Sequence, residues 1–204
     1  TEMLNSGMSK TRVKKILSSD YLVIPKKATL AVDVALNEKR ISGEVEDKDC
    51  SVYISIPFCP TRCSYCSFVS YTTPRLLSLI DPYIDALCID LDDTFDTIDA
   101  LGMKLTTVYI GGGTPTTLSE LQLEKLLSKI SSRTDTSKLL EYTMEAGRPD
   151  TITAGKLAVA KKYGVTRISV NPQTLNDDVL REIGRRHTTE DFFNAYKIAK
   201  ESGI

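Results

Sequence analysis

Several classes of protein are excluded by what this sequence of 204 residues lacks. No apolar run approaches the roughly 20 residues of a membrane-spanning helix, and the N-terminus has no apolar segment typical of a signal peptide. Basic and acidic residues nearly balance, and a net charge of −1 points to neither a nucleic acid nor an anionic membrane surface. With five cysteines, the chain is far from a disulfide-dense secreted protein. We therefore expect a reducing, cytoplasmic location.

Histidine is nearly absent as well, since His187 is the only one. Cys59, Cys63 and Cys66 nevertheless stand together in the spacing C-x3-C-x2-C, directly after residues 51–57, whose alternation of apolar residues predicts a strand. A cubane iron–sulfur cluster usually takes four thiolates. A loop this short supplies three and leaves one iron open, as a catalytic zinc keeps an open position. A structural zinc site without an obvious fourth ligand, or a disulfide with a spare thiol, are the alternatives.

From residue 51 onward, predicted strands alternate with predicted helices at close spacing. This order indicates a parallel sheet with crossover helices, and four strands are too few to close an eight-stranded barrel. Cys88 falls on the apolar stripe of the first helix, which predicts a core position, and Cys50 is expected to lie outside the site. The strands are 51–57, 106–110, 141–145 and 165–170; the helices are 76–101 (one or two), one capped by Ser119 and Gln122, 153–163, 175–183, and one starting near Thr188.

Residues 1–49 form a predicted helical N-terminal extension and linker, and residues 50–204 form a second domain. Helical patterns cover residues 10–22 and a run that starts at Pro25, and the charged stretch 43–49 indicates a linker. The chain begins with Thr1 rather than Met and ends at Ile204. We expect both ends to be cut from a longer protein.

Candidate functional residues follow the predicted strands, at the end where such β/α folds place their chemistry. Gly112, Gly113 and Thr114 belong to a glycine-rich turn, which can present backbone N–H groups to an anion as a nest. Taken alone, a glycine-rich turn is more often only a structural connection between a strand and a helix than a binding site. Glu145 ends the third strand and suits an ammonium group or ribose hydroxyls. Gln173 follows the fourth strand, and Arg185 suits a carboxylate through its bidentate fork; solvated surface roles are the alternative for these three.

Together these segments resemble the oxygen-independent coproporphyrinogen III oxidase family of the radical S-adenosylmethionine (SAM) superfamily, over residues 51–204. The segments at 145–153 and 168–173 are most similar to the branch of HemZ-type coproporphyrinogen dehydrogenases. The resemblance implies an α/β fold, an open (β/α)6 barrel that is truncated here after about four β/α units, with strands five and six beyond Ile204. The segments are 53–59 with the three cysteines, 111–116, Glu145, 172–176 and 183–187.

The same resemblance implies a [4Fe–4S] cluster on Cys59, Cys63 and Cys66, with SAM on the open iron. Cleavage of SAM by an electron from the cluster then yields a 5′-deoxyadenosyl radical. The remaining matched residues would contact SAM. Tyr53 and Tyr65 would touch it, Gly112, Gly113 and Thr114 would meet its methionine part, and Glu145, Gln173 and Arg185 would hold its adenosyl and methionine parts or a second SAM.

The implied function is oxidative decarboxylation of coproporphyrinogen III propionates to vinyl groups in haem biosynthesis, with reduced flavodoxin or ferredoxin as electron donor. One position departs from the best-understood oxidases, which carry a further cysteine where this chain has Phe68. Related haem chaperones have an aromatic residue there. A haem-binding chaperone and another radical SAM reaction on a tetrapyrrole are therefore the alternatives. We expect residues 1–204 alone to be inactive, because two barrel strands are absent from them.

Overall fold

A computed structural model describes residues 1–43 and 46–204, so positions 44 and 45 of the predicted linker lie outside the described residues. The chain divides into two compact units, Thr1–Asp47 and Lys48–Ile204, and each is described by itself. In the part of the chain that the structure describes, no helix is both long enough and apolar enough to cross a membrane.

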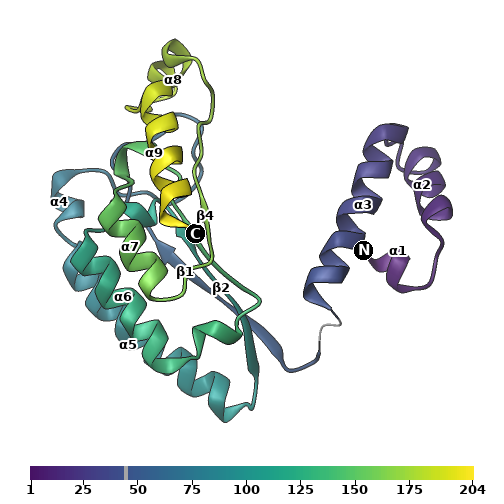
Figure 1. Ribbon diagram of the computed structural model, residues 1–204, viewed down its shortest axis with the longest axis horizontal. Helices are drawn as coiled ribbons and strands as arrows, with labels where there is room; N and C mark the ends of the chain where they lie inside the picture. Colours follow the sequence, from purple (N-terminus) through teal and green to yellow (C-terminus); the bar gives the residue numbers. More distant parts are fainter. Residues whose placement is uncertain (44–45) are drawn as a thin grey trace. The chain divides into compact units, whose positions relative to one another are not determined.

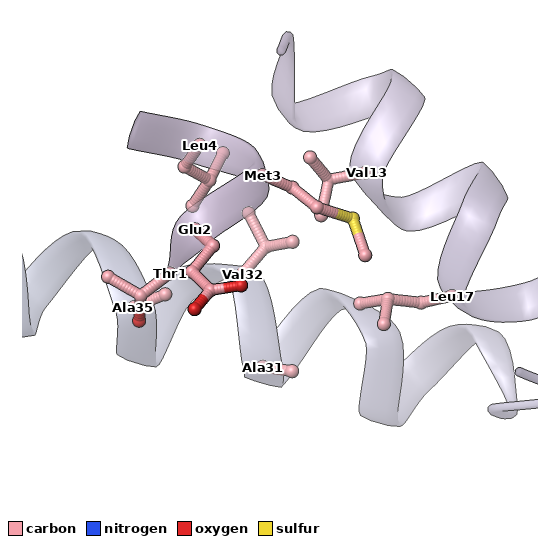
Figure 2. A pocket seen from close by; sticks show the side chains of 9 residues that line it. All are labelled: Thr1, Glu2, Met3, Leu4, Val13, Leu17, Ala31, Val32 and Ala35. Carbon is pink, nitrogen blue, oxygen red and sulfur yellow. The ribbon is translucent and has the colours of Figure 1, made fainter. Parts of the chain in front are cut away.

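The first unit consists of three helices, α1 (Glu2–Asn5), α2 (Lys10–Ser19) and α3 (Pro25–Ser42). The Ser9 side chain caps α2 by accepting a hydrogen bond from the Arg12 amide, and Pro25 opens α3, where its missing N–H costs nothing. Both predicted helices are confirmed, and α1 is an addition to them. The three helices line an apolar cavity of about 320 Å³, which includes Val13 and Val32 (Figure 2).

The second unit is built on one parallel sheet whose four strands stand in sequence order (Figure 1). The predicted alternation of strands and helices is confirmed. Of the one or two helices expected over residues 76–101 the structure has two, and the fourth strand is shorter than predicted. Its strands are β1 (Asp49–Ile56), β2 (Lys104–Gly112), β3 (Glu141–Glu145) and β4 (Arg167–Ser169). Its α-helices are α4 (Pro74–Leu77), α5 (Ile80–Ala100), α6 (Glu120–Arg133), α7 (Ala154–Lys162), α8 (Asp177–Glu182) and α9 (Thr189–Ser202).

One face of this sheet forms the hydrophobic core beneath α5 and α6. Alternate residues of each strand point to this face, because successive side chains of a strand lie on opposite sides. Cys88 on α5 is buried in the same core, as predicted. The buried strand residues are Val52, Ile54, Ile56, Val108, Ile110, Tyr142 and Met144, and the helices add Ile84, Leu91, Leu123, Leu126, Leu127 and Ile130.

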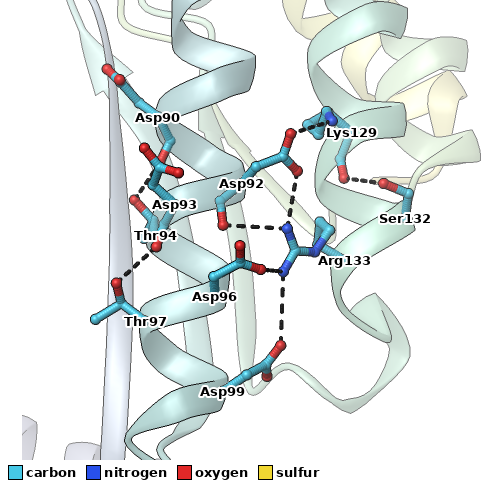
Figure 3. A network of polar contacts seen from close by, with 10 residues as sticks. All are labelled: Asp90, Asp92, Asp93, Thr94, Asp96, Thr97, Asp99, Lys129, Ser132 and Arg133. Atoms are coloured by element: carbon cyan, nitrogen blue, oxygen red, sulfur yellow. Dashed lines mark hydrogen bonds and ion pairs between the residues drawn. The ribbon is translucent and has the colours of Figure 1, made fainter.

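A network of largely half-buried polar side chains joins α5 and α6 (Figure 3). Asp92 of α5 accepts hydrogen bonds from Lys129 at 2.8 Å and from Arg133 at 3.0 Å, and Arg133 also reaches Asp96. These basic partners hold the pKa of the Asp92 carboxyl below its usual value. Ion pairs that are open to solvent contribute little to stability, so the buried apolar side chains of the two helices supply most of it.

The opposite face of the sheet carries polar side chains. The strand register places Tyr53, Tyr109, Thr143 and Arg167 in one row across β1 to β4. The rings of Tyr53 and Tyr109 stack with centroids 5.8 Å apart, and Arg167 Nε donates a hydrogen bond to Thr143 at 3.1 Å. One row nearer the carboxyl ends, Glu145 pairs with Ser169 in the register. This polar face leads to the loops that carry the candidate residues.

Candidate cofactor site

The loops after the four strands enclose a cavity of about 180 Å³. All of the predicted site residues except Tyr53 line it, so these sequence segments meet at one place in the fold. The cavity of the first unit is larger, but its lining is mainly apolar. The predicted residues that line the strand-end cavity are Cys59, Cys63, Tyr65, Cys66, Gly112, Gly113, Thr114, Glu145, Gln173 and Arg185.

The cysteine loop is closed at its base by two backbone hydrogen bonds. The Tyr71 amide donates to the Pro57 carbonyl at 2.7 Å, and the Cys59 amide donates to the Tyr71 carbonyl at 3.1 Å. Cys59 and Cys63 are buried, whereas Cys66 is half-buried. The loop therefore returns to the end of β1 and holds all three thiols on the wall of one cavity.

The segment after α8 supports the outer side of this loop. Ser64 donates its amide to the Ile183 carbonyl at 3.1 Å, and the Thr61 hydroxyl donates to the Gly184 carbonyl at 2.9 Å. Gly184 has a φ of +80°, and a Cβ there would lie 2.6 Å from the Arg62 carbonyl oxygen. Glycine is required at this position because both the backbone conformation and the close approach exclude a side chain.

The glycine-rich turn after β2 packs directly against the start of the cysteine loop. The amides of Gly113 and Thr114 donate to the carbonyls of Ile56 and Phe58, each at 2.8 Å. The predicted nest is therefore wrong for these two amides, because protein carbonyls already occupy them. The Thr114 hydroxyl lies 3.2 Å from Cys59 Sγ. Burial raises the pKa of the Cys59 thiol, and this hydroxyl opposes the shift.

Two buried arginines line the cavity. Arg185 donates from Nη1 to the Gly147 carbonyl at 2.7 Å and from Nη2 to the Tyr65 hydroxyl at 3.3 Å. Arg148 donates from Nη2 to Cys63 Sγ at 3.2 Å and to the Thr61 carbonyl. Within residues 1–43 and 46–204, Arg185 Nε and Arg148 Nη1 are buried without a hydrogen-bond partner. Buried charges are costly unless paired, so this wall is suited to anionic groups.

Glu145 supplies a carboxylate at the rim of the polar face. The Tyr109 hydroxyl donates to Glu145 Oε1 at 2.7 Å, and this hydrogen bond raises the pKa of Tyr109 to about 12. Tyr53 stacks on Tyr109 and lies outside the cavity lining, with 58% of its surface exposed. Tyr109 was assigned no role from the sequence, although it lies two residues before Gly111 and therefore on the same face of β2.

Gln173 is one of two non-glycine residues with a positive φ among the described residues, at +62°. The left-handed conformation costs a non-glycine residue roughly 1–2 kcal/mol, and such strain gathers at functional sites. Asn171, two residues after the end of β4, also lines the cavity. His187 does not line it; its Nε2 lies 3.3 Å from the Pro172 carbonyl oxygen, and the side chain is buried, which fits a packing role.

The donors of this cavity fit an iron–sulfur cluster with a bound amino acid group. Within residues 1–43 and 46–204, no three His, Cys, Asp or Glu side chains are grouped to hold one metal ion. A cluster takes its thiolates at separate iron atoms, so its ligands need not converge on one point. The unpaired arginine donors suit a carboxylate and the negative charge of thiolates, and Glu145 suits an ammonium group.

Arg148 and Thr61 are functional candidates that sequence reasoning missed. Arg148 follows Glu145 by three residues in the loop after β3, and Thr61 lies between two of the cysteines. The one sequence feature that could have pointed to them is their position in loops that already carry predicted site residues. Nothing local to either residue predicts that the Arg148 side chain reaches the cysteine loop.

Comparison with known proteins agrees with this geometry. Residues 53–204 match the family described as the Radical SAM superfamily. The chain is 36% identical over 209 residues to the oxygen-independent coproporphyrinogen-III oxidase-like protein HemZ of Bacillus subtilis, covering 98% of this chain and 41% of that protein. It is 42% identical over 156 residues to the heme chaperone HemW of the same organism, covering 76% of this chain and 40% of HemW.

A solved structure of the coproporphyrinogen III oxidase HemN from Escherichia coli, described as a radical SAM enzyme, is similar in fold. It matches with a TM-score of 0.67 and 25% sequence identity, and the match covers 82% of this chain and 38% of HemN. The chain thus spans about two fifths of the length of the relatives it matches. The four-stranded sheet corresponds to part of a radical SAM barrel.

Proposed function

Since this chain belongs to the radical SAM superfamily, we propose that Cys59, Cys63 and Cys66 are the ligands of its [4Fe–4S] cluster. The cluster and SAM are the cofactors of this superfamily. The observation that carries the assignment is that three thiols of one short loop line a cavity together with two buried guanidinium groups. Bound together, the two cofactors supply a 5′-deoxyadenosyl radical that removes a hydrogen atom from a substrate.

The other walls of the cavity are proposed to bind SAM. Arg185 would pair with the carboxylate through its unpaired Nε donor, and Glu145, oriented by Tyr109, would accept from the ammonium group or from ribose hydroxyls. Gln173 and Asn171 would add amide contacts from the loop after β4. Gly112, Gly113 and Thr114 would form the wall beside the cluster, and Tyr65 would pack on SAM. Tyr53 would act from the polar face, through its stacking on Tyr109.

For the reaction, we propose oxygen-independent oxidative decarboxylation of coproporphyrinogen III. Each propionate that reacts would lose a hydrogen atom, carbon dioxide and one electron, and a vinyl group would remain in its place. A reduced flavodoxin or ferredoxin would supply the electron that SAM cleavage needs. The proposal is supported by the similarity to HemZ along nearly the whole chain and by the fold of HemN. The protein's part is to hold and orient the cofactors and substrate.

A second candidate function is haem binding as a chaperone. The chain is 42% identical to HemW over 156 residues, and Phe68 lines the cavity with 61% of its surface exposed. An exposed aromatic ring beside the cluster loop suits a flat tetrapyrrole in either function. The two functions differ in outcome: a chaperone would keep a stoichiometric haem complex, whereas the oxidase would release a vinyl product.

The ligand assignment is tested by anaerobic reconstitution with iron and sulfide, followed by electron paramagnetic resonance (EPR) of the reduced protein. We expect a [4Fe–4S] signal that shifts when SAM is added. Cys63→Ala should lose this signal, and Cys50→Ala should keep it, because Cys50 stands at the opposite end of β1. A signal that survives in Cys63→Ala contradicts the assignment.

The reaction is tested on a protein of the relatives' full length that contains this chain. Reconstituted protein receives SAM, a reductant and coproporphyrinogen III, and the products are separated by chromatography. Vinyl products with no stable haem complex support the oxidase. A stoichiometric haem complex, seen by absorbance, with no vinyl product supports the chaperone instead.

A further inference from the structure

Arg148 makes a contact that none of the proposed roles above uses. Its guanidinium reaches from the loop after β3 to the cysteine loop, where Nη2 lies 3.2 Å from Cys63 Sγ and also donates to the Thr61 carbonyl. The side chain is 2% exposed and lines the cavity. A fixed positive charge is thus buried against one of the three cysteines.

The charge on Arg148 is permanent, because a guanidinium does not lose its proton in a protein. Its partners in the described part of the chain are a thiol and a carbonyl, and its Nη1 is buried without any partner. The Glu145 carboxylate, at the end of β3 just before this loop, accepts a hydrogen bond from Tyr109. A buried cation with a spare donor at the wall of a cavity is stabilised only when a negative group occupies that cavity.

The backbone around Arg148 is held firmly. Its carbonyl accepts from both the amide and the hydroxyl of Thr151, at 2.9 and 2.8 Å. The Thr151 hydroxyl lies 2.6 Å from that of Thr116, which follows the glycine-rich turn. Lys156 Nζ donates to the carbonyls of both threonines, at 2.6 and 3.1 Å. This bracing ties the loops after β2 and β3 together and fixes the place from which the Arg148 side chain extends.

We propose that Arg148 raises the reduction potential of the cluster through its positive charge and its hydrogen bond to Cys63 Sγ. The inference rests on the proposed assignment of the three cysteines. The potential of an iron–sulfur cluster depends on its net charge and on hydrogen bonds to its sulfur atoms. When the cluster takes one electron from an external low-potential donor, its negative charge grows by one. Arg148 stabilises that added charge, and its hydrogen bond to Cys63 Sγ acts in the same direction.

The test is an anaerobic redox titration of the reconstituted protein, followed by the EPR signal of the reduced cluster. In Arg148→Gln, the equilibrium should shift about tenfold toward the oxidised cluster, which is about 59 mV for a one-electron couple. Arg148→Lys keeps the charge and should shift it less than Arg148→Gln. The matched control is Arg62→Gln, since Arg62 adjoins Cys63 in sequence but is exposed, and its screened charge should change the equilibrium less than threefold.

Iron content separates the possible failures. If the unsubstituted protein assembles no cluster, the cysteine assignment fails. If Arg148→Gln holds the same iron as the unsubstituted protein and its equilibrium moves no more than that of Arg62→Gln, the role of Arg148 is overturned. If Arg148→Gln binds no iron, the equally neutral Arg148→Met is titrated in its place: a shift toward the oxidised cluster beyond that of Arg62→Gln supports the proposal, and an unshifted equilibrium overturns it.

Discussion

The two faces of the four-stranded sheet differ sharply in chemistry. On the face beneath α5 and α6, residues such as Ile110 and Met144 are fully buried among apolar side chains. On the other face, the same strands carry Tyr109, Glu145 and Arg167. Parallel strands buried on both faces by helices usually form nearly continuous apolar runs. The alternation here shows that one face provides stability, while the other presents polar groups toward the interior of the barrel, next to the site.

Two adjacent residues of β2 allow each face of the sheet to be altered separately by a substitution. Ile110→Ala removes a fully buried side chain and should lower the free energy of unfolding by about 2–5 kcal/mol. Denaturant unfolding followed by circular dichroism measures the change. Tyr109→Phe, one residue earlier and on the other face, is the matched control and should cost about 1 kcal/mol. Equal losses for the two variants would contradict the division of labour between the faces.

The second expected effect lies at the end of β2, where the glycine-rich turn meets the cysteine loop. A Cβ on Gly113 would lie 2.7 Å from the Phe58 carbonyl oxygen and 2.8 Å from that of Ile56. Both obstacles are backbone atoms that cannot rotate away, so Gly113→Ala should cost about 1–3 kcal/mol in unfolding free energy and reduce cluster assembly.

Gly147→Ala is the control for this prediction. The nearest atom to its Cβ would be Asn171 Nδ2 at 3.3 Å, and that atom belongs to a side chain that can move. Iron content and unfolding free energy should therefore change little. If Gly113→Ala proves as mild as Gly147→Ala, the close contact between the two loops is not needed to form the site.

The smallest predicted effect is the pH dependence of the Tyr109 hydrogen bond to Glu145. The pKa of Tyr109 is raised from 10.0 to about 12. The bond therefore contributes its full stabilisation below about pH 10, and this is lost as the pH rises toward about 12. Tyr109→Phe has no hydroxyl to titrate and should not show this loss, so the difference in unfolding free energy between the two proteins should shrink between those pH values. A difference between the two proteins that stays constant across this range would contradict the assignment.

Local patterns predicted much of the fold and of the site. Alternation in residues 51–57 and 141–145 places apolar side chains on one face, and this is a property of any strand. The three cysteines lie so close in sequence that their shared loop is almost unavoidable. Ser119 and Gln122 form the predicted capping box at the start of α6, because a cap depends only on neighbouring residues.

Contacts between distant segments were beyond such patterns. The amides of Gly113 and Thr114 were expected to face a ligand. They donate instead to the carbonyls of Ile56, at the end of β1, and Phe58, at the start of the cysteine loop, more than fifty residues earlier in the chain. The stacking of Tyr53 on Tyr109 depends on strand register, which propensity does not specify. Burial of Arg148 depends on the path of its whole loop.

Strand period, helix caps and cysteine spacing are local properties, so the residues that line the strand ends could be predicted from sequence. Which donors stay unpaired at the site depends on contacts between distant segments. Arg148 and Arg185 each donate hydrogen bonds to protein groups. Each also has one buried nitrogen that has no hydrogen-bond partner among the described residues. That outcome depends on how three loops pack together, and packing of remote segments cannot be deduced from the residues of any one of them.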